Sequence, residues 1–238
     1  MAGLGRYYHG RGVSLFCGST IVTPYHAITA AHCTYQNYDP MAIIVGDHDL
    51  TRVDESRYTK VHLVRAIDHP GYDAKRLIND IALLVTSTPI EFNTYVGPAC
   101  LPTAPMQIEG QWVKVTGWGH KRWKGTVSST LNKVFLKVIS IHSCSRKYYN
   151  RINTARPNQF CTYNTRKDSC QGDSGGPVTW LDPETNRYTL AGVVSYGGEC
   201  ASEWPGVNTD VYSFLPWINS NIASKYLFIS STYSSSKV

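Results

Sequence analysis

Short apolar runs separated by turn residues recur along this chain. Eight of them are rich in β-branched, aliphatic and aromatic residues, at 19–22, 42–45, 60–67, 81–86, 112–116, 133–139, 190–194 and 207–210. Several short strands with turn signals between them predict an all-β sandwich or barrel. Helical periodicity is clear at 211–222, where Val211, Phe214, Leu215 and Ile218 fall on one face. We therefore expect an all-β fold that ends in a helix.

Length and composition allow one large β domain or two small lobes, with 238 residues of which 42% are hydrophobic. The segment 99–108 carries two prolines and divides the chain near its middle, so we expect a linker there. Residues 225–238 are rich in serine and predict a disordered tail. No apolar run approaches the roughly 18–20 residues of a membrane-spanning helix, so we expect no membrane partner.

Charge and residue spacing narrow the choice of partners and cofactors. The net charge of +6 is modest, and its one cluster, at 120–124, mixes bases with a tryptophan. Such a cluster could bind nucleic acid or heparin, but a solvated basic loop is commoner, and we expect no nucleic-acid partner.

The sequence contains neither a C-x-x-C nor an H-E-x-x-H motif, so it gives no indication of a zinc site. Asp47, Asp49, Asp54 and Glu55 surround a loop that offers calcium ligands, but acidic loops are mostly just solvated, so we expect no metal or other cofactor.

The segment Cys170–Pro177 is the strongest candidate for chemistry. In it Ser174 stands among three glycines, directly after an aspartate. Glycines allow a sharp turn that exposes the serine Oγ and directs the N–H groups of Gly172 and Ser174 at one point. Acyl transfer needs such a nucleophile beside donors for the oxyanion. On its own, however, the segment also fits a glycine-rich surface turn.

Two further residues supply what a serine nucleophile needs. A serine hydroxyl requires a base, and the base requires a group that orients it. His32 lies among small residues before a cysteine, and Asp80 opens an apolar run. Each alone has an ordinary explanation as a surface or capping residue. Together they follow the chain order His, Asp, Ser that is typical of chymotrypsin-type enzymes.

The chain thus resembles the trypsin/chymotrypsin-type serine proteases over roughly residues 17–222. Further motifs carry the resemblance: Gly97-Pro98-Ala99-Cys100-Leu101-Pro102, Thr116-Gly117-Trp118-Gly119, Val194-Ser195-Tyr196-Gly197-Gly198 and Pro205-Gly206-Val207. Details around Asp168–Gln171 and Cys200–Ser202 are similar to arthropod proteases, including those of stinging-insect venoms.

The resemblance implies a peptidase domain at 1–224 with two packed antiparallel β-barrels of the six-stranded type. The first barrel would span about 1–104 and the second about 105–210, followed by the helix at 211–222. The active site would lie in the cleft between them. Met1 aligns inside the first strand of the family, so we expect that strand region to be truncated.

The seven cysteines allow three pairs and leave one over. The resemblance implies the pairs Cys17–Cys33, Cys144–Cys161 and Cys170–Cys200. Three disulfides would require an oxidising compartment, so we expect a secreted, extracellular protein. Cys100 is the odd residue. In many relatives the equivalent cysteine bridges to a segment upstream of the catalytic domain.

The resemblance also implies roles for the residues at the catalytic centre. His32 would accept the proton of Ser174 and pass it to the leaving amine, while Asp80 would fix the imidazole tautomer. The N–H groups of Gly172 and Ser174 would bind the oxyanion. Ser195 would support Asp80 and form part of an edge along which the substrate pairs.

Substrate choice would depend on Asp168, six residues before the nucleophile. In the family this position is the base of the pocket for the residue before the cleaved bond, and a carboxylate there selects Arg or Lys. Gly197 and Gly206 would leave the pocket walls open, and Tyr196 would form the floor of the neighbouring subsite. A surface aspartate is the alternative for Asp168.

Asp173 has another role in the family, where it pairs with the N-terminal ammonium that activation cleavage creates. No signal peptide and no Ile-Val-Gly-Gly-like segment precede Cys17. We therefore expect residues missing upstream, a loop that turns Asp173 outward, and a zymogen-like state for the chain as written. A buried carboxylate without its partner would cost several kcal/mol.

The expected partners are protein or peptide substrates with Arg or Lys at the cleaved position. Serpin-type and Kunitz-type inhibitors would also fit such an enzyme, and we expect a monomer. Two alternatives stand beside an active endopeptidase. One is a non-catalytic homologue that kept the fold as a binding module, and the other is a chain that is inactive because its activation terminus is missing.

Overall fold

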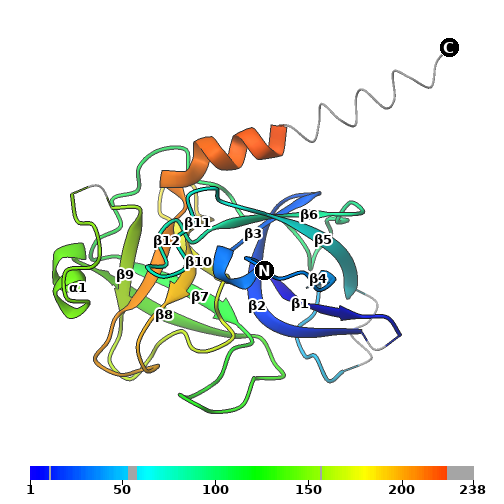
Figure 1. Cartoon of the computed structure of the whole chain (residues 1–238), viewed down its shortest axis with the longest axis horizontal. Coiled ribbons are helices and arrows are strands. Elements are labelled where there is room, and N and C mark those ends of the chain that lie inside the picture. Colours follow the sequence, from blue (N-terminus) through cyan, green and yellow to red (C-terminus); the bar gives the residue numbers. More distant parts are fainter. Residues whose placement is uncertain (11, 53–57, 156, 224–238) are drawn as a thin grey trace.

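The computed structural model describes residues 1–10, 12–52, 58–155 and 157–223, and its strands form two closed barrels (Figure 1). The first barrel contains β1 (Ala2–Tyr8), β2 (Gly12–Thr23), β3 (His26–Thr29), β4 (Met41–Val45), β5 (Lys60–Asp68) and β6 (Ala82–Thr86). The second contains β7 (Trp112–Gly117), β8 (Asn132–Ile139), β9 (Gln159–Tyr163), β10 (Pro177–Asp182), β11 (Arg187–Tyr196) and β12 (Gly206–Asp210). The predicted pair of six-stranded antiparallel barrels is confirmed.

Alternating side chains explain why these segments form barrels. In β7, Val113 and Val115 are buried while Trp112 is exposed, as expected when one face of a strand meets a core. The buried face joins Leu136, Val178 and Ala191 of other strands in the core of the second barrel. The eight predicted runs coincide with strands, except that Ile81 precedes β6, whereas β1, β3, β9 and β10 had no clear signal in the sequence.

Helical segments complete the fold outside the two barrels. The predicted helix at 211–222 begins as a 3₁₀ turn at Tyr212–Phe214 and continues as an α-helix over 215–223. Phe214 and Ile218 of this segment pack against the core of the first barrel. A second helix, α1 (Ile141–Lys147), was not predicted. The tail at 225–238 lies outside the described residues.

Three disulfides join distant parts of the barrels, and their pairs are those that the resemblance implied: Cys17–Cys33, Cys144–Cys161 and Cys170–Cys200. Cys100 carries a free thiol. No helix among the described residues is long and apolar enough to cross a membrane.

Candidate active site

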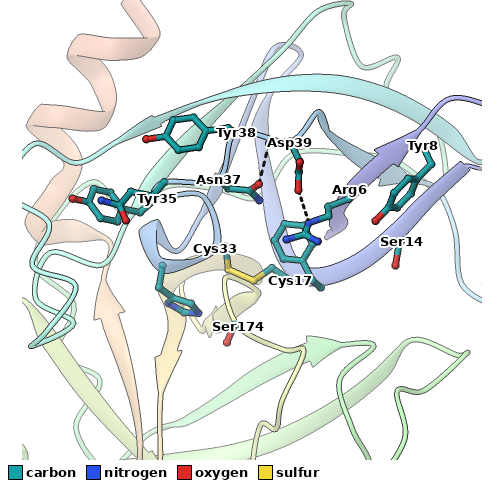
Figure 2. Close-up of a pocket in the computed structure, with 13 residues that line it drawn as sticks. Arg6, Tyr8, Ser14, Cys17, Cys33, Tyr35, Asn37, Tyr38, Asp39 and Ser174 are labelled. Carbon is teal, nitrogen blue, oxygen red and sulfur yellow. Dashed lines mark hydrogen bonds and ion pairs between the residues drawn. A yellow bond between two sulfur atoms is a disulfide. The ribbon is translucent and has the colours of Figure 1, made fainter.

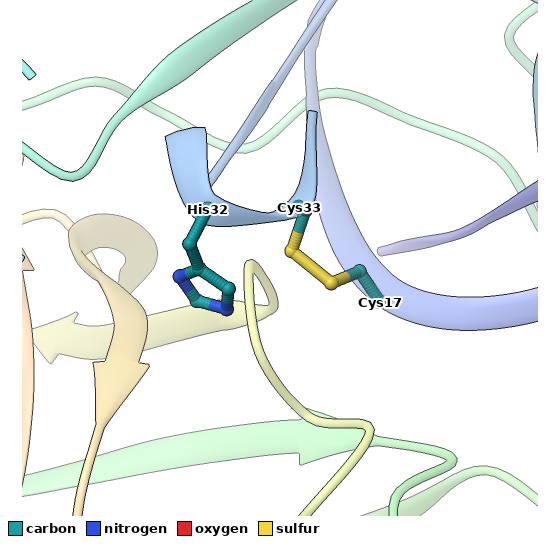
Figure 3. A group of neighbouring side chains, drawn as sticks. All are labelled: Cys17, His32 and Cys33. Carbon is teal, nitrogen blue, oxygen red and sulfur yellow. A yellow bond between two sulfur atoms is a disulfide. The ribbon is translucent and has the colours of Figure 1, made fainter. Parts of the chain in front are cut away.

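His32 lies on a single 3₁₀ turn, Ala31–Cys33, that follows β3. The Cys17–Cys33 disulfide ties this turn to β2, next to the imidazole (Figure 3). The backbone N–H of His32 donates to Oδ1 of Asp80 at 2.8 Å, and Nδ1 of the ring contacts Oδ2 at 2.7 Å. Because an ionised carboxylate only accepts hydrogen bonds, Nδ1 carries the proton, which leaves Nε2 as the basic nitrogen.

Asp80 is fully buried just before β6, and both barrels supply its donors. Besides the two bonds from His32, its Oδ2 accepts the hydroxyl of Ser195 on β11 at 2.5 Å. The backbone carbonyl of Asp80 accepts the hydroxyl of Thr209 on β12 at 2.8 Å. A buried carboxylate is tolerated when donors surround it, so this network holds the aspartate and the histidine ring in one orientation.

Ser174 lies in the loop before β10, where two cavities meet. One cavity, of about 830 Å³, is lined by Ser174, His32 and the Cys17–Cys33 disulfide, and Figure 2 shows the serine below that disulfide. The other, of about 290 Å³, is lined by Ser174 together with Asp168. The serine therefore faces a groove on one side and a smaller pocket on the other.

The backbone N–H groups around the serine fall into two sets. Gly172 has a φ of +93°, a left-handed conformation that favours glycine. The N–H groups of Asp173, Gly175 and Gly176 donate to backbone carbonyls. Within the described part of the chain, those of Gly172 and Ser174 donate to none. These are the two groups that the sequence predicts as oxyanion donors.

Asp168 lies in the smaller pocket with every predicted pocket residue. Ser195, Tyr196, Gly197 and Gly206 all line this cavity. A Cβ added to Gly206 would lie 3.3 Å from the hydroxyl of Thr162 and 3.4 Å from Oδ1 of Asp168, so a larger side chain here would crowd the carboxylate. Desolvation by burial raises the pKa of Asp168 to about 6, although the N–H groups of Ala201 and Ser169 partly offset it.

Some residues of this pocket were not among the predicted site residues: Trp123, Ser169, Gln171, Val194 and Gly198. Trp123 belongs to the basic cluster at 120–124, which was interpreted only as a solvated loop. The N–H of Lys124 donates to the side-chain oxygen of Gln171 at 3.1 Å, which holds this loop at the pocket. A tryptophan among bases gave no signal of that role, because the contact spans 47 residues.

Asp173 differs from its sequence prediction. Its Oδ1 accepts the N–H of Gly119 at 2.9 Å and its Oδ2 that of Cys170 at 2.8 Å, so the carboxylate points inward and the expected outward turn is wrong. Burial raises its pKa, while the two amides and the nearby His120 act in the opposite direction. A cavity of about 200 Å³ lies beside it. These two backbone donors replace part of the hydration that the carboxylate loses on burial, so it can stay inside without an ammonium partner.

The site offers little to a metal. Cys17, His32 and Cys33 lie close enough to share an ion, but the two sulfurs are already bonded to each other and provide no thiolate (Figure 3). Of the acidic residues considered for calcium, Asp54 and Glu55 lie outside the described residues, and Asp49 accepts bonds from Thr51.

Known proteins with similar sequences include several serine proteases. The chain is 39% identical over 220 residues to "Venom serine protease" of Polistes dominula, an alignment that covers 89% of this chain and 78% of the relative. It is 41% identical over 226 residues to "Venom serine protease 34" of Apis mellifera, covering 92% of this chain and 54% of the relative. "Clotting factor G beta subunit" of Tachypleus tridentatus is 32% identical over 219 residues, covering 85% and 69%. The family model Trypsin matches residues 4–218, and the chain therefore belongs to the trypsin family of serine proteases.

Proposed function

We propose that this protein is a secreted serine endopeptidase that hydrolyses peptide bonds after Arg or Lys. The observation that carries the proposal is the arrangement around Ser174. A histidine held by a buried aspartate lines one cavity with the serine, and a half-buried carboxylate, that of Asp168, lines the other. The first pair supplies a base, and the second supplies a charge that a cationic side chain can neutralise.

The chemistry follows from these positions. Nε2 of His32 accepts the proton of Ser174 as Oγ attacks the peptide carbonyl, and the imidazolium then gives this proton to the leaving amine. Water attacks the acyl-enzyme by the same route in reverse. Asp80 stabilises the imidazolium, and its network keeps the proton on Nδ1. The N–H groups of Gly172 and Ser174 stabilise the oxyanion, and one such donor is typically worth about 3–4 kcal/mol.

Specificity comes from the cavity that holds Asp168. Its volume of about 290 Å³ admits one long side chain, and Gly197 and Gly206 keep its walls low. A guanidinium or ammonium that reaches the carboxylate replaces the lost hydration of both groups, whereas an apolar side chain leaves a buried charge unpaired. An edge formed by Ser195–Gly197 of the chain would pair with the substrate backbone.

Secretion fits the three disulfides, since such bonds persist in oxidising compartments. Two of the relatives carry "venom" in their names.

The expected partners are protein substrates and serpin- or Kunitz-type inhibitors, and the protein would act as a monomer without a metal. A binding module without activity is not favoured, because His32, Asp80 and Ser174 are all present and His32 contacts Asp80.

A labelling experiment tests the proposal. The activated protein should react with a fluorophosphonate at one residue, Ser174, and should hydrolyse a short arginine anilide. Ser174→Ala should lose both the label and the turnover. Labelling that survives Ser174→Ala, or turnover that prefers a phenylalanine or leucine anilide over the arginine anilide, would refute the nucleophile or the specificity respectively.

A further inference from the structure

A third cavity adjoins the pocket that contains Asp168. It has a volume of about 650 Å³ and is lined by Lys75, Arg76, Leu77, Ile78, Tyr148, Arg151 and Tyr196. Tyr196 lines both this cavity and the pocket of Asp168, so the two are neighbours. When the basic side chain of a substrate occupies the pocket of Asp168, the residues that precede it would run past Tyr196 into this third cavity. Since Tyr196 is expected to floor the subsite before the cleaved residue, the third cavity would receive residues further toward the substrate N-terminus.

Three cations dominate the lining of this third cavity. Lys75, Arg76 and Arg151 are all exposed to solvent. Among the described residues, Lys75 and Arg151 form no ion pair, and Arg76 lies 4.0 Å from Asp73. Burial raises the pKa of Tyr148 and of Tyr196, so both rings stay neutral and add no negative charge. Among the described residues, the cavity therefore has an excess of positive charge, which the carboxylate of Asp73 offsets only in part.

The cations come from both barrels and are held by well-ordered turns. Asp73 accepts the backbone N–H groups of Lys75 and Arg76, which fixes the turn that carries them. The carbonyl of Leu77 accepts the side-chain amide of Gln159, 82 residues away on the second barrel. This contact fastens the first-barrel loop to the second barrel, so the backbone that carries Lys75 and Arg76 needs little reorganisation when a ligand binds.

Arg151 faces them from the second barrel, where it follows α1. Its backbone N–H donates to the carbonyl of Tyr148 at 3.1 Å, and the hydroxyl of Tyr148 donates to the carbonyl of Pro205 at 2.5 Å. Tyr148 also packs edge-on against Tyr196, with ring centroids 5.6 Å apart. The aromatic floor and the backbone of Arg151 are thus connected through Tyr148.

We infer that this cavity is a subsite for acidic side chains, and that the protein selects substrates with Asp or Glu two to four residues before the cleaved Arg or Lys. This inference rests on the proposed function for the direction of the substrate. An extended peptide advances about 3.3 Å per residue, so neighbouring residues reach successive parts of the cavity. Acidic groups there meet the three cations, while the basic residue that follows neutralises Asp168.

The test compares two isosteric substrates. Acetyl-Asp-Asp-Ala-Arg anilide should exceed acetyl-Asn-Asn-Ala-Arg anilide in kcat/KM by roughly tenfold at low salt, as expected for two or three solvent-exposed charge pairs. The ratio should shrink toward one at about 0.5 M salt, because the screening length there is only a few ångströms. An equal rate for the two peptides at low salt, or a higher rate for a peptide with phenylalanine in place of the aspartates, would overturn the inference.

Two triple variants locate the effect. Lys75→Gln with Arg76→Gln and Arg151→Gln should bring the ratio to about one, while a short arginine anilide that lacks these upstream residues is hydrolysed as before. The matched control, Lys60→Gln with Lys137→Gln and Arg187→Gln, removes the same charge from exposed positions elsewhere and should keep the ratio. A control that loses the preference equally would mean that net charge, and not the cavity, selects acidic peptides.

A binding measurement separates this inference from the proposed function. Ser174→Ala protein should bind fluorescein-labelled Asp-Asp-Ala-Arg peptide roughly tenfold more tightly than the Asn-Asn-Ala-Arg peptide at low salt. Failure of the proposed function would appear as no turnover of the short arginine anilide by the wild-type protein. The ratio of the two affinities, measured by fluorescence anisotropy, would still test the acidic subsite. Equal affinities for the two peptides would reject it.

Discussion

Two carboxylates on either side of Ser174, the buried Asp80 and the half-buried Asp168, have opposite environments. Asp80 accepts hydrogen bonds from the backbone and ring of His32 and from Ser195. Asp168 has only weak or local donors, with the N–H of Ala201 at 3.4 Å and no cation among the described residues. Burial accordingly raises the pKa of Asp168 to about 6. One carboxylate is fully satisfied by the protein, and the other is not.

The difference indicates how one fold assigns two roles to one residue type. A carboxylate whose oxygens are already occupied can fix the geometry of a neighbour, but it has nothing left for a ligand. A partly desolvated carboxylate with few donors is costly to the free protein, and a cationic ligand relieves that cost. Substitutions that change only the hydrogen-bonding capacity of each residue therefore test the comparison directly.

The largest effect is expected at Asp80. Asp80→Asn keeps the shape of the side chain but brings an NH₂ group to a site where Ser195 and His32 donate. The ring should then adopt the wrong tautomer, and kcat on an arginine anilide should fall by about 10,000-fold, a loss typical of this substitution in such triads. Retention of more than about a tenth of the wild-type kcat would show that the tautomer does not depend on Asp80.

A smaller effect is expected at Asp168, because the triad remains intact. Asp168→Ser removes the charge that a substrate cation would meet in the pocket. The preference for arginine over leucine anilides in kcat/KM should fall by about a hundredfold, or about 3 kcal/mol, as for the loss of one partner from a desolvated charge pair. The fluorophosphonate label on Ser174 should be retained. A variant that keeps its arginine preference would mean that another residue recognises the cation.

The sequence predicted the fold and the individual triad residues because both have local signals. Glycines around Ser174 and the apolar run after Asp80 each occupy a few consecutive residues, and strands such as β7 alternate visibly. The resemblance then related segments that are far apart in the chain. The pairing of His32 with Asp80 spans 48 residues, and no local pattern indicates it.

The sequence was less informative where loops from different parts of the chain meet. Trp123 lines the pocket of Asp168, and the Lys75 loop reaches the second barrel through Gln159. Neither contact follows from composition, because loop positions depend on how the barrels pack. The error at Asp173 has another cause. The amides of Gly119 and Cys170 supply donors that a count of charged partners ignores.

The smallest effect concerns the stability of the free protein. An aspartate in the unfolded chain ionises near its ordinary pKa of about 3.9. Burial raises the pKa of Asp168 in the folded protein to about 6, so the folded state holds this proton over a range where the unfolded state has lost it. The free energy of unfolding should therefore fall as pH rises from about 4 to about 6 and remain lower above that range.

Asp168→Asn removes this desolvated charge and should stabilise the protein by about 1–2 kcal/mol at pH 8, after allowance for solvent screening, and by almost nothing at pH 4. Urea unfolding of both proteins in a Ser174→Ala background, which prevents self-digestion, measures the difference. Asp182→Asn is the control, since hydrogen bonds from Thr185 and Glu184 lower the pKa of that exposed carboxyl and its loss should bring no gain at pH 8. If Asp168→Asn were no more stable than wild type at pH 8, the carboxylate of Asp168 would already be satisfied in the free protein, and the contrast with Asp80 would disappear.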